Sequence, residues 1–88
     1  MLFKSVAEQH SKGAAAHLNI DNVTELSWIR VQGSSATSDM ALPYSGWFIL
    51  INIPIDSNFS LQFAIGQTGG SLRMRIKWDA AFREWITL

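Results

Sequence analysis

The amino-acid sequence predicts a small all-β domain, and three of its features carry that prediction. Residues 59–66 and 72–78 alternate apolar and polar side chains with a period of two, as β-strands do. A Gly-Gly pair between these runs is typical of a hairpin loop. Residues 47–53 (WFILINI) form an apolar run that ends at Pro54 and is too short for a typical helix. We therefore expect a small antiparallel β-sheet or sandwich.

The first 20 residues differ in character from the rest of the chain. They are compatible with a helix, and we interpret them as a short, loosely ordered N-terminal arm. A short trimeric stalk helix is the alternative, because candidate seam positions recur at steps of three and four residues. These positions are Phe3, Val6, His10, Gly13, His17 and Ile20.

Residues 21–88 form the predicted domain. Residues 26–32 are rich in β-branched and aromatic side chains and predict the first strand. The run at 47–53 is interpreted as a strand buried on both faces. A C-terminal meander follows over residues 59–88, in which 82–88 form the last strand unless residues 80–85 make a helical turn. Loops and turns are expected at residues 33–39, around Pro43 and Gly46, and at 56–58, 67–71 and 79–81.

Composition limits the classes of function that this chain can serve. Its 88 residues suffice for one domain, and the formal net charge of 0 favours neither nucleic acid nor an anionic membrane. The longest apolar run is too short to insert across a bilayer, and residues 1–20 lack the apolar run of a signal peptide. Hydrophobic residues make up 48% of the chain and charged ones 16%, which favours self-association.

Catalytic chemistry is not expected. The sequence has no cysteine and two histidines, too few for a convincing zinc site, so neither a metal nor a cofactor is predicted. His10 and His17 lie in the N-terminal arm, where a general base would be poorly positioned. Asp56 and Asp79 lie in predicted turns, where aspartate bonds the local backbone. We therefore predict that the protein is not an enzyme.

A basic stripe follows one strand of the meander, formed by Arg73, Arg75 and Lys77. The alternation places it opposite the apolar side chains of the same strand, so we interpret it as a solvated outer face. A surface for an anionic ligand and a salt-bridged contact between subunits are the alternatives. The apolar face of the meander is expected to supply the core and subunit contacts.

The aromatic residues divide into two groups. Trp28, Phe63 and Phe82 are interpreted as core, and Trp78 and Trp85 are expected to pack across strands.

Tyr44 and Trp47 flank a loop with Pro43 and Gly46, where rings can stay exposed. Such rings suit the apolar face of a sugar, whereas ordinary packing is the alternative. The predicted ligand-binding residues are Tyr44, Trp47, Arg73 and Arg75.

Three segments of the sequence resemble the pyocin-knob domains at the tips of phage tail fibres and pyocin fibres. The segments are LNIDNVTELSWIRVQGSSAT, LPYSGWFILINIP and SLRMRIKWDAAFREWITL, within residues 18–88. The distinctive matches are Gly46-Trp47 and the closing run Phe82-x-x-Trp85-x-x-Leu88. Two positions depart from the family pattern: residues 25–27 (ELS) stand where Pro-Gly is usual, and Phe82 stands where tryptophan is usual.

The resemblance implies a homotrimeric tail-fibre or tailspike tip on the virion, outside the bacterial cell. It implies contact with bacterial surface polysaccharide during host recognition. Within the same family, the alternative is a structural domain that trimerises or caps a fibre and has no ligand of its own.

Overall fold

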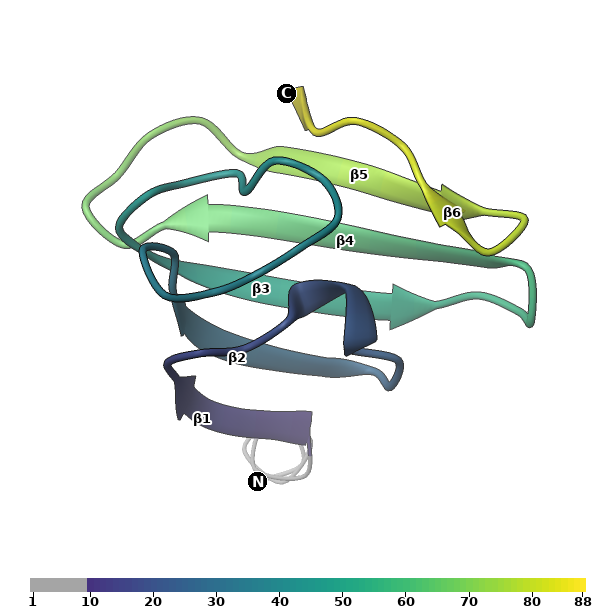
Figure 1. Ribbon diagram of the computed structural model, residues 1–88, viewed down its shortest axis with the longest axis horizontal. Helices are drawn as coiled ribbons and strands as arrows, with labels where there is room; N and C mark the ends of the chain where they lie inside the picture. The colour runs from purple at the N-terminus through teal and green to yellow at the C-terminus, as the bar shows by residue number, and fades with distance from the viewer. Residues whose placement is uncertain (1–9) are drawn as a thin grey trace, which may run out of the picture.

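The computed structural model describes residues 10–88 and contains one sheet of seven strands (Figure 1). The strands lie side by side in the order β1-β2-β3-β4-β5-β6, and β7 pairs with β5 beside β6. This confirms the predicted all-β fold. The elements are β1 (Ser11–Ala15), the 3₁₀ turn η1 (Ile20–Asn22), β2 (Ser27–Gln32), β3 (Trp47–Pro54), β4 (Phe59–Gly66), β5 (Arg73–Trp78), β6 (Ala81–Phe82) and β7 (Ile86–Thr87).

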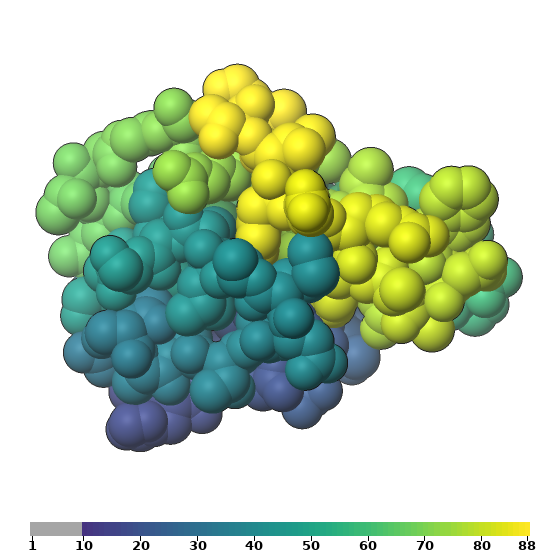
Figure 2. Space-filling model, turned by 45° about the horizontal axis from the view of Figure 1, so that its top comes forward, coloured from purple at the N-terminus to yellow at the C-terminus, as the bar shows by residue number. Residues whose placement is uncertain are grey.

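Strands β2 to β6 form an antiparallel meander in which each strand pairs with the next along the chain. The side chains of β2 to β5 therefore fall on two faces of the sheet. One of them, which we call the covered face, lies under η1 and the loop 33–46 (Figure 1). Figure 2 shows this loop in teal beside the C-terminal segment in yellow.

The hydrophobic core of the described residues lies entirely between the covered face and these segments. The sheet contributes Ile29, Val31, Phe48, Leu50 and Ala64, and the covering segments contribute Ile20 and Ala36. Buried polar residues share the same face, namely Ser27, Asn52, Gln62 and Arg75. The core is thus a mixed layer of apolar and hydrogen-bonded polar side chains.

The opposite face, which we call the apolar face, consists mainly of hydrophobic side chains outside this core. Its central row runs across the strands through Trp28, Ile51, Phe63 and Met74. None of its residues belongs to the core cluster or to the partly buried residues packed against that cluster. Its members are Trp28, Arg30, Gln32, Trp47, Ile49, Ile51, Ile53, Phe59, Leu61, Phe63, Ile65, Met74, Ile76 and Trp78.

Three expectations about burial are therefore wrong. Strand β3 is not buried on both faces, since Phe48 and Leu50 are buried whereas Ile49 is 38% exposed. Trp28 and Phe63 lie on the apolar face and are only half-buried. On β4 and β5 the polar side of the alternation, rather than the apolar side, faces the core. Alternation separates two faces, but it does not tell which face the chain's own loops cover.

The segment after residue 10 also differs from the expected arm or helix. Ser11–Ala15 is strand β1, which pairs in parallel with β2, with an irregular register between Ser11 and Ala14. Gly13 lies in this irregular stretch with φ of 71°. Alanine-rich sequence favours a helix locally, but pairing with an edge strand overrides that preference here. The expectation for residues 1–9 lies outside the described residues.

The end of the meander is only partly regular. The predicted strand at 82–88 consists of the short strands β6 and β7, separated by residues 83–85, and the alternative helical turn is not formed. Backbone hydrogen bonds from Arg83 N to Ile76 O and from Leu88 N to Leu72 O hold the segment to β5 and to the residue just before it. Trp85 packs against the core from this segment.

Candidate functional site

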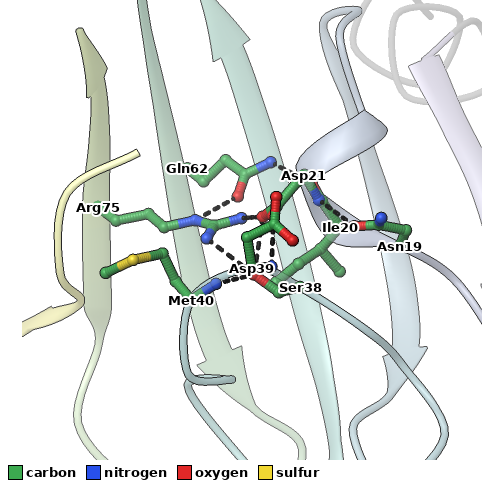
Figure 3. A network of polar contacts seen from close by, with 8 residues as sticks. All are labelled: Asn19, Ile20, Asp21, Ser38, Asp39, Met40, Gln62 and Arg75. Carbon is green, nitrogen blue, oxygen red and sulfur yellow. Dashed lines mark hydrogen bonds and ion pairs between the residues drawn. The ribbon is translucent and has the colours of Figure 1, made fainter. Parts of the chain in front are cut away.

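Arg75 is the centre of a buried polar network on the covered face (Figure 3). Its Nε donates to Gln62 Oε1 at 2.8 Å, and its Nη2 lies 2.7 Å from Asp21 Oδ1. Its Nη1 donates to Ser38 Oγ at 3.2 Å. Gln62 Nε2 in turn donates to the carbonyl oxygen of Ile20 at 2.9 Å. The network therefore joins β4 and β5 to η1 and to the loop 33–46.

Asp21 is the acidic partner in this network. Its Oδ2 accepts a hydrogen bond from the backbone N–H of Asp39 at 2.6 Å, and its Oδ1 accepts one from Ser38 Oγ at 2.7 Å. Burial acts to raise the pKa of Asp21, but these hydrogen bonds and Arg75 outweigh burial and hold the pKa below its usual value. Burial lowers the pKa of Arg75, against the opposing effect of Asp21.

This network corrects the interpretation of the basic stripe. Arg75 is 1% exposed and Arg73 and Lys77 are half-buried, so the stripe is not a solvated outer face. The rings of Phe82 and Trp85 close over the Arg75 guanidinium, with centroids 3.7 and 4.8 Å from Cζ. Because its charge faces Asp21, Arg75 is placed as a structural residue and not at a ligand surface.

Tyr44 and Arg73 are brought together, and each is held by the protein. The Arg73 guanidinium lies 4.5 Å from the centroid of the Tyr44 ring, and its Nη1 donates to the carbonyl oxygen of Pro43. The Tyr44 hydroxyl donates to the carbonyl oxygen of Ser71. One face of the Tyr44 ring is thus occupied by Arg73. The pair fixes the loop 33–46 to the segment between β4 and β5.

Trp47 lies beside Tyr44 at the rim of an open hollow of about 470 Å³. The walls come from the start of β3 and from the turn after β4, which are linked by a hydrogen bond from Gln67 N to Trp47 O at 3.0 Å. The Arg30 guanidinium lies 4.7 Å from the Trp47 ring centroid. The lining residues are Tyr44, Ser45, Gly46, Trp47, Gly66, Gln67, Thr68 and Gly69.

The hollow combines aromatic and polar groups. Ser45, Gln67 and Thr68 are exposed and offer hydroxyl and amide groups, while Trp47 offers part of an aromatic ring. Two of the four predicted ligand residues, Tyr44 and Trp47, line it. Arg73 does not line the hollow but contacts Tyr44, which does. Arg75 is not part of the hollow.

The polar groups that sequence reasoning missed are Gln67 and Thr68 in the hollow, and Asp21 and Gln62 in the network. Asp21 and Gln67 both lie in sequence that reads as turns, so local pattern gives no hint of their partners. A signal did exist for Gln62, because it lies directly opposite Arg75 across the β4–β5 pair. Glutamine facing arginine on one sheet face indicates a hydrogen bond between the two strands.

Residues 10–88 hold neither a cluster of metal ligands nor a membrane-spanning helix. No group of three or more histidine, cysteine, aspartate or glutamate side chains gathers there in a way that could hold a metal ion. No helix of that part is long and apolar enough to cross a membrane.

The Nδ1 atom of His10 lies 3.1 Å from the Leu26 carbonyl oxygen, and its ring packs on Trp28 with centroids 5.6 Å apart.

Comparisons of the chain with protein-family models, with curated proteins and with solved structures found no match.

Proposed function

We propose that this chain is a non-enzymatic domain at the tip of a phage tail fibre or tailspike, where it forms a homotrimer and binds bacterial surface glycan. The observation that carries the proposal is the hollow between Trp47 and the turn at residues 67–69. The resemblance to pyocin-knob domains supports the same role, since Gly46-Trp47, one of its distinctive matches, lies in that hollow. The domain would then act on the virion, outside the cell.

The chemistry of the hollow suits a sugar better than an apolar or strongly charged ligand. Its volume of about 470 Å³ falls within the range of small-ligand sites. A sugar presents hydroxyl groups and a patch of C–H bonds, which match the amide and hydroxyl groups of Gln67 and Thr68 and the ring of Trp47. No charged side chain lines the hollow, so a neutral glycan that binds there would not bury an unpaired charge of the protein.

Glycan-array binding of the 88-residue protein tests the proposal. We expect the native protein to bind one class of surface polysaccharide, and Trp47→Ala or Gln67→Ala to weaken that binding by tenfold or more. Ser57→Ala is the matched control, because Ser57 is an exposed residue of the β3–β4 turn and does not line the hollow. A folded native assembly that binds no bacterial glycan would contradict the glycan role.

A structural module that trimerises or caps a fibre is the second candidate function. The apolar face favours it, because that face has a size and composition suited to contact with other chains and does not require a ligand. The same binding experiment separates the two. An assembled protein that binds no glycan supports the structural role, whereas a glycan-binding assembly favours the first proposal.

A further inference from the structure

The apolar face is a wide hydrophobic surface with almost no charge. Arg30 is the one charged side chain among its members on β2 to β5, and it lies against Trp47. Large hydrophobic residues on this face stay well exposed, with Ile49 at 38%, Ile65 at 39% and Trp78 at 57%. Soluble single chains rarely leave so many neighbouring apolar side chains in contact with water.

The dimensions of the sheet give the size of this surface. Four strands about 4.8 Å apart and up to about 26 Å long present on the order of 500 Å². That is the upper range for the largest apolar patch of a monomer. Two such faces in contact would remove on the order of 1,000 Å² from water, which is the area at which specific interfaces begin.

We infer that the apolar face, apart from Trp47 at its edge beside the hollow, is the surface through which copies of this chain pack against one another. The inference rests on the proposed function only in taking the number of copies as three. When a face with a single charge meets a copy of itself, at most one pair of like charges can come together, and a second sheet provides a matching pleated surface. A charged partner, such as nucleic acid or an anionic membrane, would find almost no pairing group there.

Residues 1–9 are too few to cover the apolar face. A nine-residue segment covers on the order of 130 Å² even as a helix about 13 Å long and about 10 Å wide. More than two thirds of the apolar face would remain outside such a segment. A copy of the sheet, in contrast, matches the whole face in area.

Charge insertion on the face tests the inference by light scattering after size exclusion. We expect the native protein to have about three times the mass of one chain, and Ile49→Glu and Ile65→Glu to fall to the mass of a single folded chain. Both side chains are partly exposed already, and Ile49 lies opposite Arg30, so a glutamate there need not unfold the sheet. Thr37→Glu is the matched control: Thr37 is exposed and lies in the loop 33–46, which covers the opposite face of the sheet, so we expect this variant to keep the native mass.

Cross-linking gives a second measurement that does not depend on loss of assembly. Because the sequence has no cysteine, Ile65→Cys introduces a single thiol. We expect a short bis-maleimide to join copies of this variant and to join copies of Thr37→Cys, whose thiol lies on the other side of the sheet, far less. Circular dichroism of every variant should show the native β spectrum.

Several results would overturn the inference. A native protein that is a monomer would do so, as would glutamate variants that keep the native mass. A monomeric Ile65→Cys variant whose introduced thiol is protected from a small maleimide would show that the chain covers its own face. Failure of glycan binding by an assembled protein leaves the interface intact and removes only the glycan proposal. Assembly of two copies instead of three supports the interface and contradicts the homotrimer.

Discussion

Arg75 is the bulkiest fully buried side chain in the described part of the protein. A buried guanidinium loses its contacts with water, so hydrogen bonds and an opposite charge from the protein must replace them. Gln62, Ser38 and Asp21 supply them from three different segments. The hydrogen bonds of Arg75 therefore fix the positions of η1 and the loop 33–46 on the sheet.

Replacement of Arg75 by methionine should destabilise the protein strongly. Arg75→Met keeps much of the side-chain length but leaves Asp21 and Gln62 without their partner, at a cost of about 3 kcal/mol in the free energy of unfolding. Arg73→Met is the matched control, since Arg73 is only half-buried and forms no ion pair with another of the described residues. Urea denaturation measures both. An equal decrease in the free energy of unfolding for the two variants would argue against the structural role of the network.

Acid should weaken the same network. The pKa of Asp21 is lower in the folded protein than its ordinary value of 3.8, so the unfolded chain takes up the proton first as pH falls. The stabilisation is present in full above the ordinary pKa and is lost as pH falls through the lowered one. We expect the free energy of unfolding to drop below about pH 4, and Asp21→Asn to show a shallower drop, as measured by urea titration from about pH 7 to about pH 2.5. A native profile no steeper than that of Asp21→Asn would contradict this.

At the scale of elements, the loop 33–46 takes the place that a second sheet has in a sandwich. It contributes Ala36 and the buried Pro43, and it is held at its two ends by a hydrogen bond from Gly33 N to Gly46 O at 3.0 Å. Tyr44 fixes its far side to the β4–β5 connection. A single irregular segment thus covers much of the core.

Gly33 is the position at which this loop tolerates no side chain. A Cβ atom at Gly33 would lie 2.7 Å from the Gly46 carbonyl oxygen and closer still to that of Tyr44. We expect Gly33→Ala to lower the free energy of unfolding by about 2 kcal/mol, because the backbone of the loop must move. Gly46→Ala is the matched control, since a Cβ there meets no atom within 4 Å and should change stability by less than about 0.5 kcal/mol. Thermal unfolding of both variants decides, and a neutral Gly33→Ala would contradict the packing described.

The sequence predicted the strands of the meander well because their alternation extends over six to eight residues. It failed at β1, where small residues carry no strand pattern and pairing with β2 determines the conformation.

The candidate site was predicted in part. Tyr44 and Trp47 do share a hollow, since a loop with Pro43 and Gly46 brings them near each other. Arg75 was misplaced because its partner Asp21 lies 54 residues away and no local pattern reveals it.

At the scale of the whole molecule, the face of the sheet that carries more apolar side chains lies outside the hydrophobic core. On β4 and β5 the polar side is buried because the chain supplies partners for Gln62 and Arg75, and the opposite face of the sheet carries the exposed Ile49 and Ile65. The high hydrophobic fraction of the sequence therefore resides largely on a face that the core does not use. If copies pack through that face, as we infer, the assembled protein has two kinds of core: one within each chain and one between chains.

The covering role of the loop 33–46 also limits how this domain can diversify. Surface loops usually vary freely because little depends on them. Here Ala36, Pro43 and Tyr44 are constrained as core residues are, although they lie outside regular structure. The turn at residues 67–69 is exposed throughout and borders the same hollow. If the hollow binds glycan as we propose, changes of specificity, in nature or in a designed library, would therefore accumulate in this short turn, while the longer loop beside it stays fixed.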